Sequence, residues 1–145
     1  MPEFISNTSC LILLSKIDRI QVLNELYGSV TVTNLVLGEF GEEIPDFFIV
    51  KELKNKSLFN NLTSIIDPGE ASTIALGLEI KDSTLILDDY KARTVAQKLN
   101  LRFTGTLGVL HKAHKSGLIK DLKAEIINLK SHGFWISDEI INSIT

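Results

Sequence analysis

The sequence predicts an α/β fold: a three-layer α/β/α sandwich with a small parallel sheet, followed by a helical C-terminal third. Short β-branched or apolar runs alternate with segments of helical periodicity, an order typical of a parallel sheet covered on both faces. The run 84–87 is compact and mostly apolar, as in a strand buried on both sides. From 107 to 144 little strand pattern remains, and we expect three helices there.

Local signals divide the first half of the chain. Asn7 or Thr8 can cap a first helix, Gly28 can end a second one, and Asn34 can cap the helix that carries Glu39. Pro45 marks a break. In chain order we expect a strand at 4–6, helices at 8–14 and 18–27, a β-branched strand at 30–33, a helix after 34 and a further helix at 46–53. Residues 54–61 fit either a loop or a helix–loop–strand, and 65–66 a short extended piece.

The second half carries the clearest periodicity. Pro68 opens a helix in which Ala71, Ile74, Ala75 and Leu78 share one face. The remaining expectations are a strand at 84–87, a helix at 92–99, a last strand at 101–103, a helix marked by Leu122, Ile126 and Leu129, and a final helix that Ser137 can cap. The sheet should hold four or five strands.

Composition narrows the class of protein. The chain has 145 residues, of which 44% are hydrophobic, so we expect one domain over 1–145. Its single cysteine, Cys10, excludes an internal disulfide. The start lacks a signal-peptide pattern and no apolar run is long enough for a bilayer, so we expect a cytoplasmic protein with no membrane contact.

Charge is distributed unevenly along the chain. The net charge is −3, yet between Tyr90 and Lys123 the only carboxylate is Asp121 among many lysines and arginines. A basic face beside an acidic cleft suits an enzyme that grips phosphates. Ordinary solvated helix faces explain such a run equally well.

Three polar segments stand at strand-to-helix junctions or helix starts: 6–9, 67–71 and 87–90. In an α/β protein these junctions collect at one edge of the sheet, where ligands bind. Carboxylates and amides offer only oxygen, which suits Mg²⁺ or Mn²⁺. The sequence therefore predicts a metal-dependent hydrolase, one that cuts RNA.

The motifs 6–9, 68–71, 87–89 with 92–93, and 104–108 occur in an order and spacing that resembles the PIN-domain superfamily, most closely a branch of small prokaryotic proteins related to VapC-type toxins. The resemblance implies an α/β/α sandwich, Mg²⁺- or Mn²⁺-dependent ribonuclease activity, homodimers and, in toxin members, a partner antitoxin. The family's acidic positions fall on Asn7, Glu39, Glu70 and the pair Asp88/Asp89.

Roles follow from that alignment. Asn7, Glu39, Glu70 and Asp88 are the expected metal ligands, with Glu42 and Glu43 close to the second position. Asp89 is a second ligand or a positioner. Thr106 would hold a water or a phosphate oxygen, Lys91 and Arg93 would contact RNA, and Thr8 and Ser9 would support Asn7. Because the ligand carboxylates repel one another, we expect Glu70→Gln and Asp88→Asn to keep or raise the melting temperature.

Asn7 departs from the family pattern, in which this position is usually Asp. An amide oxygen can bind a hard cation but brings no negative charge, so metal affinity should fall. An alternative is therefore a degenerate PIN module that binds RNA or a protein and cuts little. A third interpretation, a phosphoryl-transfer enzyme of receiver-like α/β type, is disfavoured because in this chain no lysine follows a late strand in the right context. His111 and His114 have no third ligand beside them, and no histidine motif offers a partner to Ser9 or Cys10 as a nucleophile.

Overall fold

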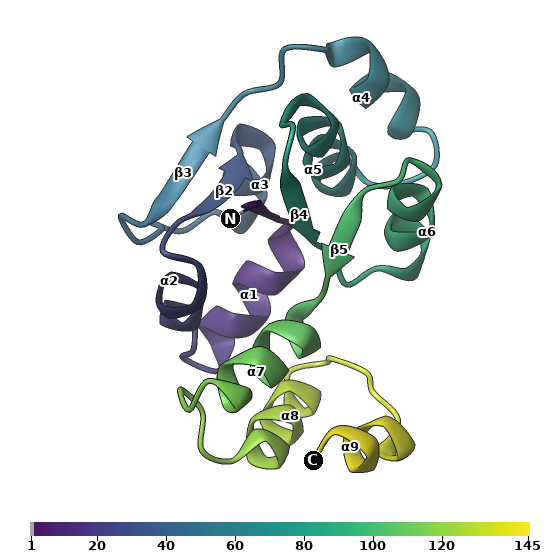
Figure 1. Ribbon diagram of the computed structural model, residues 1–145. Helices are drawn as coiled ribbons and strands as arrows, with labels where there is room; N and C mark the ends of the chain where they lie inside the picture. The colour runs from purple at the N-terminus through teal and green to yellow at the C-terminus, as the bar shows by residue number, and fades with distance from the viewer. Residues whose placement is uncertain (1) are drawn as a thin grey trace.

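A five-stranded parallel sheet forms the centre of the protein in the computed structural model, which describes residues 2–145 (Figure 1). Its strand order is β3-β2-β1-β4-β5. The strands are β1 (Glu3–Ser6), β2 (Val30–Thr33), β3 (Phe48–Lys51), β4 (Ser83–Ile86) and β5 (Arg102–Thr104). Every pairing is parallel, and β1 and β4 pair along four residues, from Glu3 opposite Ser83 to Ser6 opposite Ile86.

Helices cover the sheet and extend below it (Figure 1). They are α1 (Thr8–Lys16), α2 (Gln21–Tyr27), α3 (Asn34–Phe40), α4 (Lys56–Leu62), α5 (Pro68–Glu79), α6 (Tyr90–Lys98), α7 (Thr106–Lys115), α8 (Leu122–Ser131) and α9 (Asp138–Ile144). The last three form the helical C-terminal third and lie together beyond one end of the sheet. None of the helices within residues 2–145 is both long and apolar enough to cross a membrane.

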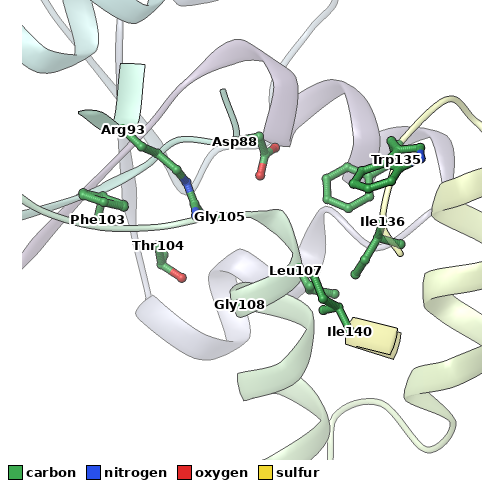
Figure 2. A pocket seen from close by; sticks show the side chains of 11 residues that line it. Asp88, Arg93, Phe103, Thr104, Gly105, Leu107, Gly108, Trp135, Ile136 and Ile140 are labelled. Carbon is green, nitrogen blue, oxygen red and sulfur yellow. The ribbon is translucent and has the colours of Figure 1, made fainter. Parts of the chain in front are cut away.

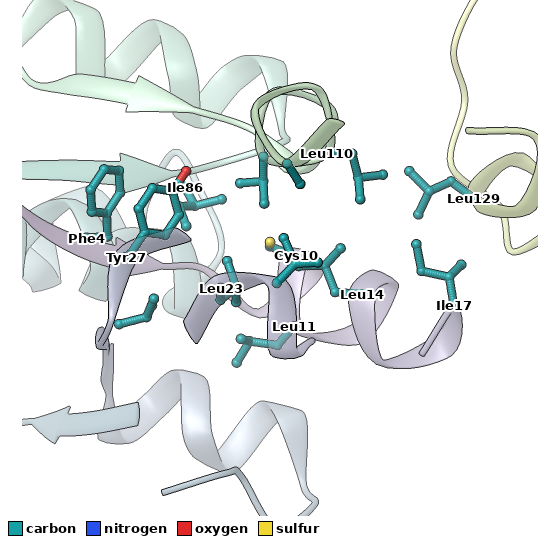
Figure 3. Packing of buried hydrophobic residues seen from close by; sticks show 14 of the residues in the cluster. Phe4, Cys10, Leu11, Leu14, Ile17, Leu23, Tyr27, Ile86, Leu110 and Leu129 are labelled. Carbon is teal, nitrogen blue, oxygen red and sulfur yellow. The ribbon is translucent and has the colours of Figure 1, made fainter. Parts of the chain in front are cut away.

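Alternation along the strands divides the core into two clusters. On β1, Phe4 packs with α1, α2, α7 and α8, whereas its neighbour Ile5 packs with α4, α5 and α6. On β4, Ile86 faces the first cluster and Leu85 the second. Figure 3 shows the first cluster, in which the rings of Phe4 and Tyr27 stack at 3.8 Å. The three-layer sandwich predicted from the sequence is confirmed.

The strand order creates the cleft. The chain runs outward from β1 through β2 to β3 and then returns to the other side of β1 as β4. The connections after β1 and β4 therefore diverge, and ligands of parallel sheets bind in the crevice at such a point. Asn7 follows β1 and Leu87-Asp88 follows β4, so the predicted site residues flank this crevice.

Four local predictions were wrong. Residues 46–53, predicted as a helix, contain strand β3, which pairs with β2 from Val30–Phe48 to Thr33–Lys51. The short apolar run of β3 has neither helical nor strand periodicity of its own, so its conformation is set by pairing with β2. Residues 65–66 lie in a turn after α4, not in an extended piece. Thr33, not Asn34, caps α3, and α2 begins at Gln21 instead of 18.

Candidate functional site

The first turn of α1 is the centre of the site. Asn7 lies between the end of β1 and the start of α1, and it is only 4% exposed. It caps α1, because its side-chain Oδ1 accepts a hydrogen bond from the Thr8 backbone N–H at 2.7 Å. Its own backbone N–H bonds the Ile86 carbonyl at 3.0 Å, which ties the helix start to β4. The cap is thus locked to both central strands.

Glu39 approaches this turn from α3. Its Oε1 accepts a hydrogen bond from the Thr8 hydroxyl at 2.6 Å. The same oxygen lies against Gly69, where an added Cβ would stand 2.1 Å away. A side chain at position 69 would have to displace the flexible end of the Glu39 side chain from the position in which Thr8 holds it.

Asp88 is held on the other side of the turn. Its Oδ1 accepts the Thr106 backbone N–H at 2.7 Å, and its Oδ2 accepts the Thr106 hydroxyl at 2.6 Å and the Ser9 hydroxyl at 3.1 Å. Thr106 is fully buried and gives both its donors to Asp88. Thr106 thus orients the carboxylate of Asp88, and its predicted contact with water or phosphate stays a prediction.

Glu70 lies between these groups at the start of α5. It forms a capping box with Asp67: its backbone N–H donates to Asp67 Oδ1 at 2.9 Å, and its own Oε1 accepts the Asp67 N–H at 3.4 Å. Burial, and then the negative charges of Asp67 and Asp89, raise the pKa of Glu70 from 4.5 to about 7. A nearby positive charge would stabilise the ionised form of this carboxyl, which burial and the neighbouring acids disfavour.

A hollow of about 530 Å³ collects three of these acids. Glu70, Asp88 and Asp89 share it with the exposed Lys16 and with Trp135. Asp89 also caps α6, accepting the Ala92 N–H at 3.0 Å. Its full lining is Ser9, Ile12, Leu13, Lys16, Glu70, Asp88, Asp89, His132, Gly133, Phe134 and Trp135.

A second hollow of about 450 Å³ adjoins the first and is also lined by Asp88 (Figure 2). It shares Asp88, Phe134 and Trp135 with the first hollow and adds Arg93. In Figure 2 Arg93 and Trp135 stand on opposite sides of Asp88 as the pocket is seen.

The two residues predicted to contact RNA, Lys91 and Arg93, differ in exposure and in the contacts that they make. Lys91 is exposed on the first turn of α6. Arg93 is partly buried: its Nε donates to the Leu87 carbonyl at 2.7 Å, and its guanidinium lies 5.2 Å from the centre of the Phe103 ring. Arg93 thus holds the segment after β4 that contains Asp88, and it also lines the second hollow.

The donor set matches a hard divalent cation, because carboxylates and one amide supply oxygen alone. The raised pKa of Glu70 also marks a position that favours added positive charge. The side chains are not gathered into a ligand shell: within residues 2–145, no three His, Cys, Asp or Glu side chains are arranged to hold a metal. Each of these carboxylates accepts at least one hydrogen bond from a donor group of the protein.

The sequence analysis missed three contributors. Asp67 was seen only as part of a polar segment, although an acid three residues before Glu70 is a capping-box signal. Lys16 and Trp135 gave no periodic signal that points to the hollow. Cys10 is excluded as a thiolate nucleophile, since burial and then the charge of Asp88 raise the pKa of its thiol to about 12.

The parallel α/β sandwich has Asn7 after β1, Asp88 after β4 and Glu70 at the start of α5, an arrangement compatible with a nuclease-type fold. The comparison with protein families agrees: the PIN-domain model matches residues 3–145, nearly the whole chain, and the chain belongs to this family. PIN domains are generally nucleases that depend on divalent metal ions. A search of curated proteins found no match to this chain.

Proposed function

We propose that this protein is a metal-dependent endoribonuclease. The observation that carries the proposal is the shared hollow: Glu70, Asp88 and Asp89 line one cavity beside the first turn of α1 in a PIN-domain chain. Each acid is presented by a helix start or strand end that the sequence encodes locally, so the arrangement does not depend on a flexible loop.

The chain's residues divide the work. Glu70 and Asp88, together with Glu39 and Asn7, which line neither hollow, would hold Mg²⁺ or Mn²⁺. When bound, the metal supplies positive charge that stabilises the phosphate and lowers the pKa of an attacking water. Thr106 and Ser9 fix the direction of Asp88, and Thr8 fixes that of Glu39. Lys91 would contact the RNA backbone outside the hollow, with Arg93 nearer to Asp88.

The role in the cell belongs to the same proposal. The resemblance to VapC-like proteins suggests the toxin of a toxin–antitoxin pair, acting in the cytoplasm as a homodimer and neutralised by an antitoxin protein. The basic stretch from Tyr90 to Lys123 supports RNA as the substrate, and one of its members, Arg93, lines the second hollow together with Asp88.

A second candidate is a PIN module that binds RNA or a protein without cutting. Three observations favour it. Asn7 supplies an amide at a position where a charge would strengthen metal binding, and no three acids within residues 2–145 converge on one point. Asp88 already accepts three hydrogen bonds, which a metal would have to compete with.

Calorimetric titration with Mn²⁺, followed by a cleavage assay on single-stranded RNA, separates the two. The nuclease proposal expects one saturable Mn²⁺ event and metal-dependent cleavage, both lost in Glu70→Gln. Glu43→Gln is the matched control, because Glu43 is exposed and lines neither hollow. RNA binding without Mn²⁺ uptake or cleavage would replace the nuclease with the binding module.

A further inference from the structure

Trp135 is the one tryptophan in the sequence, and its side chain is unusually open for that residue type. It is 82% exposed, on the connection between α8 and α9. The buried Ile136 follows it and anchors the connection in the core. A large indole held outward by a fixed backbone suggests a contact surface, because exposing it alone costs apolar solvation.

The indole stands between the two hollows and lines both. Asp88 is also common to both, so the ring borders the acids of the proposed site. The neighbouring surface is mixed: Phe103 and Ile140 are apolar, while Thr104 and Asp88 offer polar atoms. A flat ring with polar edges suits such a surface better than an aliphatic side chain does.

Each of the two hollows that the ring lines also holds one cationic side chain, and in Figure 2 Arg93 lies beyond Asp88 as seen from the ring. Lys16 lines the first hollow, and Arg93 lines the second. A ligand that stacks on Trp135 and extends in both directions would place its anionic groups near these two cations. A polynucleotide strand has this pattern, with a π-face at each base and a phosphate on each side of it.

We propose that Trp135 is a stacking platform for one unpaired nucleobase of a single-stranded nucleic acid, with the flanking phosphates directed to Lys16 and Arg93. The proposal rests on the proposed function, because it names a substrate contact of the same site. It adds that the substrate must be single-stranded there, since a paired base is stacked within its own helix and cannot reach the indole.

The indole also reports on its own ligand. In EDTA, which prevents cleavage, a single-stranded RNA oligonucleotide should quench the fluorescence of Trp135 and saturate at the same concentration as fluorescence anisotropy of a labelled strand. A duplex of the same sequence should produce little quenching. Because no metal is needed, this result is independent of whether the protein cuts RNA.

Variants test the contribution of stacking. Trp135→Ala should weaken binding of the labelled strand by about 5- to 150-fold, the range that stacking on an aromatic side chain supplies. Trp135→Phe should restore most of it. Ile127→Ala is the control, since Ile127 is 54% exposed on α8 and lines neither hollow. Mn²⁺ affinity should be equal in all four proteins.

Failure of this inference differs from failure of the proposed function. Normal RNA affinity in Trp135→Ala, with no quenching in the parent, would overturn the stacking platform and leave the nuclease standing. Loss of a dimer in Trp135→Ala, with RNA affinity unchanged, would assign the indole to a contact between copies of the chain and would also overturn it. Quenching and weakened binding without any cleavage would keep the platform and remove the nuclease.

Discussion

Replacing Glu70 with glutamine should stabilise the metal-free protein, and the gain should depend on pH. Glutamine keeps the capping box, because its side-chain oxygen can still accept the Asp67 N–H. What the change removes is a charge that burial, Asp67 and Asp89 all disfavour. The variant therefore isolates the electrostatic cost of the site from its hydrogen bonding.

The size follows from the pKa of Glu70. A value of about 7 against an ordinary 4.5 corresponds to at most about 3 kcal/mol at 1.4 kcal/mol for each pKa unit. Water in the hollow screens part of this, which leaves about 1–2 kcal/mol. Between pH 4.5 and about 7 the folded protein keeps a proton on Glu70 that the unfolded chain has released. The contribution of this proton to the stability of the parent is therefore fully present below pH 4.5. It is lost progressively as the pH rises from 4.5 through about 7.

Urea unfolding in EDTA from pH 4.5 to pH 9 provides the assay. Glu70→Gln and the parent should differ little at the acid end, and the variant should be more stable by about 1–2 kcal/mol above pH 8. That gain is equivalent to a rise of about 3–6 °C in the melting temperature of a chain of this size. Glu43→Gln should show no such dependence. A difference that is constant across pH, or a variant that is less stable at pH 8, would refute the reasoning.

Three further outcomes are expected. Asp88→Asn should abolish cleavage and, unlike Glu70→Gln, lower stability by about 1–2 kcal/mol in thermal unfolding, since three donors lose a charged acceptor; an unchanged melting temperature would show that those bonds contribute nothing. Asn7→Asp should tighten Mn²⁺ binding in calorimetry by about tenfold and speed RNA cleavage, because it adds a charge to the site. The gain should vanish when Asp88→Asn is added, and no change in either quantity would mean that Asn7 does not face the metal. Finally, sedimentation should show a homodimer that leaves the acidic hollow open, and a monomer throughout the micromolar range would contradict this.

The elements that were predicted well carry their signal locally. Helix α5 begins at Pro68, as predicted, although it is buried at every residue from Gly69 to Gly77 and not on one face alone, and the strand predicted at 84–87 overlaps β4. Strand β3 was mistaken for a helix because its structure depends on pairing with β2, a contact that the sequence of 46–53 does not contain. Tertiary pairing of this kind overrides local propensity.

The closeness of two candidate residues could be predicted from the sequence, whereas the hydrogen bonds inside the site could not, and the role of these residues as metal ligands stays a prediction. Strand ends and helix starts told us that Glu70 and Asp88 would meet at one edge, and both line one hollow. Nothing in the sequence indicated that Thr106 gives both its donors to Asp88, which reverses the expected stability change for Asp88→Asn. Such bonds depend on side-chain directions between segments far apart in the chain.

The pairing of β1 with β4 has a consequence for the order in which the molecule is made. Ser9, which is synthesised early, donates a hydrogen bond to Asp88, and Asp88 also accepts one from Thr106. Asp88 and Thr106 both come late among the 145 residues. Contacts this distant in sequence close slowly and after the local helices. A nascent chain that has not yet exposed Thr106 holds Glu39 and Glu70 but cannot fix Asp88. The hydrogen bonds that orient Asp88 therefore cannot be complete until about three quarters of the chain has emerged.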